Sequence, residues 1–275
     1  MVVQHNLTAV NTNRQLGITT SGLQKSTEKL SSGYKINRAA DDAAGLSISE
    51  KMRNQIRGLN KASDNAQDGI SLVQTAEGAL NEVHSMLQRM SELSVQAANG
   101  TNDTTDRSSI NDEIQQLKTE IQRVGNTTQF NKMNILDGTF SNGANKLLQV
   151  GANANQTIQI DIDALQSVVG SSLKADLKTE TATNAQSAIG VVQNSIEKLS
   201  KLRSKLGAVQ NRLEHTVANL DNISENTQSA ESRIRDTDMA EEMVQYSKNN
   251  ILQQAGQSML AQANQANQGV LSLLQ

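Results

Sequence analysis

The sequence contains no cysteine, no proline and no tryptophan, and aromatic residues make up only 1% of its 275 residues. Without cysteine, a disulfide framework, a thiolate metal site and a cysteine nucleophile are all excluded. Without proline, the commonest helix breaker is absent, so long uninterrupted helices are possible. The apolar supply is Leu, Ile, Val, Ala and Met, which suits seams between helices better than an ordinary globular core.

The charge and hydropathy exclude further classes of protein. The formal net charge is -3, so no field of one sign indicates a nucleic acid or an anionic membrane as partner. No apolar run reaches the roughly 18 residues that a bilayer span needs. The stretch Met1–Thr8 has no basic region followed by an apolar segment, and we therefore expect no cleaved signal peptide and another route for any export.

The longest regular pattern begins in the first third of the chain. Apolar or small residues alternate at spacings of three and four for about five heptads, which predicts a coiled-coil helix. The same period returns near residue 189 and continues to about residue 223. Two long helices of similar length predict an antiparallel bundle. The first pattern consists of Leu59, Ala62, Ala66, Gly69, Val73, Ala76, Leu80, Val83, Leu87, Met90, Ser94 and Ala97.

The predicted fold class is mainly α, a long antiparallel coiled-coil bundle with a small central β-hairpin region. We expect helices at about 41–98, 106–125 and 184–235 within a rod domain of residues 41–237. A β region is predicted at about 126–170. There, Asp137-Gly138 is a hairpin turn signal, and Ile158, Ile160 and Ile162 alternate with polar residues. The segment 147–150 is expected to pair across the loop 151–156.

Residues 1–40 and 238–275 are predicted to form paired terminal helices, and local signals mark where helices break. Gly33 is expected to end a helix, and Asp238 to cap the last one. Asp41 is the expected N-cap of the first long helix, with Asp42 in its first turn. The terminal stripes are too sparse to hold helices alone, which suggests ordering on assembly. Their predicted polymerisation seam is Leu7, Val10, Leu252, Met259, Val270 and Leu273.

No motif supports catalysis. The sequence has neither a Gly-rich phosphate loop nor a nucleophile elbow. Each histidine lacks a second ligand three or four residues away, so no zinc site is expected at His5, His84 or His215. We predict a protein that is not an enzyme, with no catalytic residue, no cofactor and no metal. The methionines near the C-terminus are interpreted as seam fillers rather than a metal or redox site; they are Met239, Met243 and Met259.

Several segments carry a resemblance to a known family. They are Leu30–Leu46 (LSSGYKINRAADDAAGL), Asn65–Ser71 (NAQDGIS), Thr75–Leu80 (TAEGAL), Leu206–Leu213 (LGAVQNRL), Ile251–Ala255, Leu260–Gln265 and Val270–Leu274. Together these segments resemble the bacterial flagellins, the subunits of flagellar filaments. The chain is similar to a short form that lacks the large variable outer region many flagellins insert between their two halves.

The resemblance implies an extracellular helical homopolymer used for motility. The terminal helices would line the lumen of a hollow filament, and residues 41–237 would form the surrounding tube. Export would proceed unfolded through the flagellar type III apparatus. The partners implied are other copies of the chain, a secretion chaperone that masks the C-terminal helix, a cap complex and hook-junction proteins, with no nucleic acid and no membrane among them.

The resemblance also implies recognition of the monomer by the vertebrate Toll-like receptor for flagellin. The matched positions are Arg89, Leu93 and Gln96, which share one helix face, and Glu113 on the next helix. Ser91 stands where receptor-activating relatives commonly carry a second arginine, which leaves activation open. The alternative is a solvated ion pair of Arg89 and Glu113 on the flank of the bundle, with Leu93 in the core against the third helix.

Two other functions stay open at this level. A hook-filament junction protein shares the terminal pattern, but would be present in few copies per filament. A non-polymerising coiled-coil signalling protein would share the long helices, although the missing membrane span speaks against it.

Overall fold

The computed structural model describes residues 6–140, 146–170, 179 and 181–272, with side chains of the last helix described to residue 265. The predicted fold class is confirmed, because long helices dominate the described chain. They are α1 (Leu7–Ser32), α2 (Ala43–Ala98), α3 (Thr104–Thr127), α5 (Ala182–Arg235) and α6 (Met239–Ser272), with a π-helical turn η1 (Gln166–Gly170). None of the helices in the described ranges is long and apolar enough to cross a membrane.

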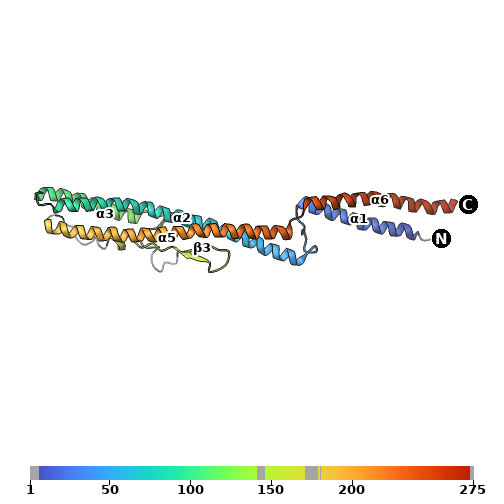
Figure 1. The fold of residues 1–275 in the computed structure, drawn as a ribbon, viewed down its shortest axis with the longest axis horizontal. Helices are drawn as coiled ribbons and strands as arrows, with labels where there is room; N and C mark the ends of the chain where they lie inside the picture. The colour runs from blue at the N-terminus through green and yellow to red at the C-terminus, as the bar shows by residue number, and fades with distance from the viewer. Residues whose placement is uncertain (1–5, 141–145, 171–178, 180, 273–275) are drawn as a thin grey trace. The chain divides into compact units, whose positions relative to one another are not determined.

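The chain divides into two compact units. One lies within residues 1–55 and 225–275, and the other comprises residues 56–224. The predicted domain boundaries fall at the breaks between helices, whereas these units divide within α2 and α5. In the first unit α1 and α6 lie side by side (Figure 1). In the second unit α2, α3 and α5 run alongside one another (Figure 1).

Two short antiparallel hairpins lie between α3 and α5. One pairs β3 (Leu147–Gln149) with β4 (Thr157–Gln159), with Leu148 opposite Ile158, which confirms the predicted pairing. The other pairs β1 (Gln129–Phe130) with β2 (Met133–Asn134). Its turn residues Asn131 and Lys132 both have positive φ, 48° and 63°, as a two-residue hairpin of the primed type requires.

The turn predicted at Asp137-Gly138 is present, and the residues 141–145 that would follow it in a hairpin lie outside the described residues. Gly138 adopts a left-handed φ of 102°, and the Asp137 carboxylate accepts a hydrogen bond from the Thr139 N–H at 2.9 Å. These residues therefore form a local turn after β2. The strand before the turn, β2, pairs with β1, and the backbone N–H of Leu165 donates to the Leu136 carbonyl at 2.9 Å. The residue just before the turn, Leu136, is thus bonded to Leu165, and both side chains lie in the core cluster.

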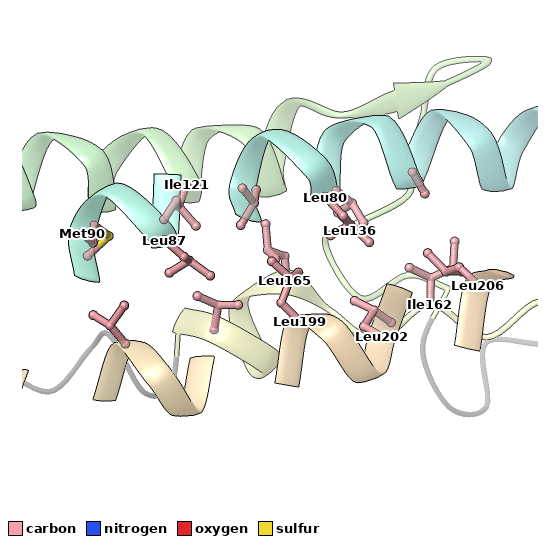
Figure 2. Close-up of a cluster of buried hydrophobic side chains, with 14 of the residues drawn as sticks. Leu80, Leu87, Met90, Ile121, Leu136, Ile162, Leu165, Leu199, Leu202 and Leu206 are labelled. Atoms are coloured by element: carbon pink, nitrogen blue, oxygen red, sulfur yellow. The ribbon is translucent and has the colours of Figure 1, made fainter. Parts of the chain in front are cut away.

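The second unit is held together by one large cluster of buried apolar side chains. Figure 2 shows side chains of α2, α3 and α5 pointing toward one another, with side chains of the connecting segment between them. Leu136, Ile162 and Leu165 of that segment are at most 2% exposed. Burying a leucine or isoleucine fully contributes roughly 1.5–3 kcal/mol each. The connecting segment therefore completes the core that the helices alone leave open.

Polar contacts fix the register of α2 against α5. The Ser63 hydroxyl donates to Asp221 at 3.1 Å, and the Ser224 hydroxyl donates to Asn60 at 2.7 Å. The serine of each pair is buried, because Ser63 and Ser224 are only 7% and 9% exposed. A shift of one turn would leave these hydroxyls unpaired, at a cost of about 1–3 kcal/mol each. The pairing also shows that the two long helices run antiparallel, as predicted.

The two breaks in the first unit are joined to each other. Gly33 ends α1 with a left-handed φ of 76°, as predicted. The Lys35 N–H donates to the Arg235 carbonyl at 2.6 Å, and the Thr237 N–H donates to the Gly33 carbonyl at 3.0 Å. The Arg235 guanidinium lies 4.7 Å from the centre of the Tyr34 ring. The connections before α2 and after α5 are therefore fixed to each other by backbone and side chain.

The start of α2 differs from the prediction. Asp42, not Asp41, is its cap, because the Gly45 N–H donates to the Asp42 carboxylate at 2.9 Å. Asp41 instead accepts hydrogen bonds from the N–H groups of Asn37 and Arg38 at 3.2 and 3.0 Å. These bonds lower the pKa of Asp41, with the bond from the Arg38 N–H as the largest cause. At α6 the prediction is confirmed, since Asp238 accepts from the Ala240 N–H at 2.9 Å.

Candidate functional site

The contact between α1 and α6 is built mainly of polar and small residues. At one end the Asn6 side chain donates to the Ala263 carbonyl at 3.0 Å, and at the other Lys29 pairs with Glu242 at 3.4 Å. Between them, Leu16 packs over Gly256, where an added Cβ would lie 3.2 Å from the Leu16 Cδ1. The helices therefore approach closely, although none of their described apolar side chains is fully buried.

Nine large apolar side chains of these helices are exposed, whereas Leu16, Leu23, Leu30 and Leu260 are half-buried. We call these exposed side chains the terminal-helix surface, and their exposed fractions run from 47% to 72%. Where exposed apolar side chains form a contiguous patch, they are typical of a contact with another molecule. The members are Leu7, Val10 and Ile18 of α1 and Met239, Met243, Val244, Ile251, Leu252 and Met259 of α6.

Four predicted seam residues, Leu7, Val10, Leu252 and Met259, belong to this surface. Leu252 and Met259 border the contact between α1 and α6, because they line a groove together with Leu16 and Gly256. The side chain of Val270 and the whole of Leu273 lie outside the described residues. All three α6 methionines are exposed in the single chain, so their interpretation as seam fillers between copies stays a prediction.

A groove of about 420 Å³ runs between α1 and α6. Its floor is apolar, with Leu16, Leu252 and Met259 among its lining, and Asn11 and Gln15 lie at its α1 side. The groove places the exposed Leu252 and Met259 next to hydrogen-bonding amides. This combination suits a helical partner that presents both apolar and amide side chains.

The predicted receptor strip is only partly a surface. The Arg89 guanidinium pairs with Glu113 at 2.9 Å and with Glu92 at 3.4 Å. The hydrogen bond to Glu113 is the largest cause that raises the pKa of Arg89. Gln96 is exposed. The structure therefore brings Arg89 and Glu113 together across α2 and α3 and leaves both accessible.

Leu93 is not part of that surface, which corrects its assignment to the strip. Its side chain is only 2% exposed and lies in the core cluster with Ile110 and Ile114 of α3. The reason is that α3 covers this face of α2. Sequence reasoning missed Val95, which is 57% exposed and lines a groove with Ile196 of α5. Its position outside the heptad pattern was the available signal.

The described residues hold no group of three or more His, Asp or Glu side chains that could bind a metal. The side chain of His84 lies beside Gln88, with Nε2 of each 3.1 Å apart. The candidate sites in the described residues are therefore the terminal-helix surface and the strip around Arg89.

Family models match both halves of the chain. Residues 3–141 match the bacterial flagellin N-terminal helical region, and residues 189–274 match the bacterial flagellin C-terminal helical region. The first match includes α1, α2 and α3, and the second includes most of α5 and all of α6.

Full-length relatives agree with the family models. The chain is 57% identical to a flagellin of Halalkalibacterium halodurans over 275 residues, covering 100% of both chains. It is 52% identical to a flagellin of Bacillus subtilis over 303 residues, again covering 100% of both. It is 49% identical to flagellin FlaB2 of Treponema pallidum over 285 residues, with the same coverage.

Solved structures support the same fold. The crystal structure of Bacillus cereus flagellin aligns with a TM-score of 0.51 at 31% identity, covering 57% of this chain and 88% of that one. A putative flagellar hook-associated protein from Vibrio parahaemolyticus aligns with a TM-score of 0.61, covering 71% of this chain and 100% of that one. Its identity is 13%, so that likeness concerns the fold alone.

Proposed function

The chain belongs to the bacterial flagellin family, whose members are structural subunits of the extracellular flagellar filament and not enzymes, and we propose that its terminal-helix surface drives polymerisation. The observation that carries the proposal is the exposure of nine large apolar side chains on α1 and α6. Covering an exposed side chain such as Val10 or Ile251, each 66% exposed, would contribute about 1–2 kcal/mol.

The domain roles follow from the same surface. We propose that residues 1–40 and 238–275 form the inner, lumen-lining part of the filament, and that residues 41–237 form the surrounding tube. The contrast in burial supports this division. Leu80, Leu87 and Leu206 are fully buried within the chain, whereas Leu7 and Val244 are 72% and 66% exposed. Most of the exposed large apolar side chains of the described residues lie on the terminal helices, where other copies would cover them.

A test uses two substitutions on α6, Val244→Ser and Ile251→Ser. Each removes an exposed apolar side chain without touching the contact with α1. We expect the critical concentration for polymerisation, measured by sedimentation and electron microscopy, to rise by on the order of tenfold for each. Gln257→Ser, on an exposed polar position of the same helix, is the matched control and should leave it unchanged. Polymerisation at the original critical concentration in both apolar variants would refute the proposal.

Unfolded export through the flagellar type III apparatus, with a secretion chaperone on the C-terminal helix and a cap complex and hook-junction proteins at the filament, is part of the proposal. The composition supports it, because a chain with no proline and no cysteine has neither prolyl isomerisation nor disulfide pairing to slow refolding after export. Co-purification of the chain with its chaperone should fail when residues of the terminal-helix surface on α6 are replaced by serine.

Recognition of the monomer by the Toll-like receptor for flagellin is also proposed, with a revised set of contacts. Arg89, Gln96 and Glu113 are exposed and can meet a receptor directly, whereas Leu93 acts by holding α3 against α2. Arg89→Ala should therefore reduce receptor activation in a reporter-cell assay without changing the helix content. An unchanged dose response would remove the Arg89 strip from the receptor contact.

A further inference from the structure

Three members of the terminal-helix surface are methionines, and all three lie on α6. Met239, Met243 and Met259 are 48%, 49% and 58% exposed. In contrast, Met90 in the core of the second unit is 0% exposed. An accessible thioether is oxidised to the sulfoxide by peroxides, whereas a buried one is protected by its packing. The chain has no cysteine, so no thiol competes for the oxidant.

We propose that these methionines form an oxidation-sensitive modification site that switches self-association off. The inference rests on the proposed role of the terminal-helix surface in polymerisation, and it adds a way in which that surface is regulated. The reagent class is a two-electron oxygen donor, of which hydrogen peroxide is the simplest. No protein cofactor takes part in the reaction.

The chemical step balances without a further co-reactant. A lone pair of the methionine sulfur attacks one peroxide oxygen, an S–O bond forms and the O–O bond breaks. The sulfur is oxidised by two electrons, and the peroxide is reduced to one water molecule after proton transfer to the departing hydroxide. The product is a sulfoxide, which is reversed by methionine sulfoxide reductase with a dithiol as the electron source.

The consequence follows from the polarity of the product. The thioether is apolar and suits a surface that another copy covers, whereas the sulfoxide oxygen is a strong hydrogen-bond acceptor. Covering the sulfoxide of Met239 or Met243 with apolar side chains of another copy leaves that acceptor without a donor. Burying an unpaired polar group is unfavourable. Met259 also lines the groove between α1 and α6, so its oxidation changes the groove that receives a partner.

The first measurement is the order of oxidation in the unpolymerised chain. Limited hydrogen peroxide, followed by protease digestion and mass spectrometry, should modify Met239, Met243 and Met259 well before Met90. Met133 of β2 is 39% exposed and should also react, which makes it the control for exposure outside α6. Oxidation of Met90 at the same rate as the α6 methionines would overturn the accessibility argument.

The second measurement compares treated with untreated samples of each variant. We expect peroxide to raise the critical concentration of the wild-type chain by on the order of tenfold, and of Met133→Leu equally. The triple variant Met239→Leu, Met243→Leu and Met259→Leu should polymerise at nearly the same critical concentration with and without peroxide. Incubation of oxidised wild type with sulfoxide reductase and dithiothreitol should restore assembly, which keeps the test valid if the triple variant assembles poorly.

Each outcome has a defined meaning. Wild type that carries all three sulfoxides and still assembles at its original critical concentration overturns the proposal, and so does loss of assembly that the reductase does not reverse. An equal loss in the treated triple variant would place the sensitive group elsewhere and also overturn it. Untreated wild type that never assembles would instead contradict the proposed function, on which this inference rests.

Discussion

At the scale of single residues, Leu93 shows that a residue of the predicted receptor strip can be a packing residue. Its side chain is 2% exposed and lies in the core cluster with Ile110 and Ile114. Leu93→Ala should therefore lower the free energy of unfolding by about 2–5 kcal/mol, since it leaves a cavity. Urea unfolding followed by circular dichroism measures this. A reduced receptor response in this variant would then report loss of the α2–α3 structure rather than loss of a contact.

The matched control is Arg89→Ala on the same helix. Because Arg89 is solvent-exposed in its pairs with Glu92 and Glu113, its removal should change stability far less than that of Leu93. If both variants unfold at the same urea concentration as the wild type, then Leu93 is not part of the core and the burial argument fails.

Asp41 makes the stability of the folded chain depend on pH in the acid range. Its folded pKa is lowered, first by the hydrogen bond from the Arg38 N–H, while the unfolded value is about 3.9. The stabilisation is therefore fully present above the unfolded pKa and is lost as the pH falls through the folded pKa. The difference in melting temperature between wild type and Asp41→Ala should be constant from about pH 5 to pH 7 and shrink below about pH 4. A difference that persists unchanged in stronger acid would contradict this role.

The same carboxylate shows a limit of prediction from sequence. Asp41 and Asp42 are adjacent and equally suited to cap a helix, so residue preference alone does not choose between them. The choice is made by the turn at 37–41, whose N–H groups point at Asp41. That turn depends on where α1 ends, which is tertiary information. At Asp238 no acidic neighbour competes, and there the predicted cap is correct.

At the scale of elements, alanine substitution of two glycines of α2 distinguishes the effect of helix propensity on stability from the effect of packing. A Cβ at Gly58 would lie 2.8 Å from the Ala152 Cβ and 3.2 Å from its Cα, whereas a Cβ at Gly78 has no neighbour within 4 Å. Gly78→Ala should stabilise the second unit by about 0.5–1 kcal/mol through helix propensity. Gly58→Ala should not stabilise the unit, because the added Cβ would force the loop of the β3–β4 hairpin away from α2.

Thermal unfolding of the two alanine variants checks the comparison. The melting temperature should rise for Gly78→Ala and should fall or stay level for Gly58→Ala. An equal rise in both would mean that the hairpin loop does not pack on α2 at Gly58.

The elements themselves could be predicted to different degrees. The long helices follow from heptads that lack proline, and β3–β4 follows from alternating isoleucines. The β1–β2 hairpin was missed because its turn uses Lys132 at a φ of 63°, a residue type that carries no turn signal. The stripe through Leu7 and Leu252 was visible, but periodicity does not say which face meets a partner in the same chain and which meets another copy.

At the scale of the whole molecule, the two units differ in how much stability their own residues supply. The second unit has a continuous apolar cluster that includes Leu80 and Leu206, both fully buried. In the first unit, α1 has a single buried residue, Ser26, and its contact with α6 is largely polar. Isolated helices with little tertiary burial are marginal in water. The terminal helices should therefore open far more often than the core of the second unit.

Hydrogen exchange measured by mass spectrometry tests this expectation. In the unpolymerised chain, amides of α1 and α6 should exchange faster than those around Leu80 and Leu206, by at least on the order of tenfold. After assembly, the slowing of exchange should be largest in α1 and α6, because other copies then cover Leu7, Val10 and Ile251. The core amides should change little and serve as the internal control. Equal protection of both units before assembly would show that the contact between α1 and α6 is sufficient to keep these helices folded. Their stability would then give no physical reason for contacts with other copies.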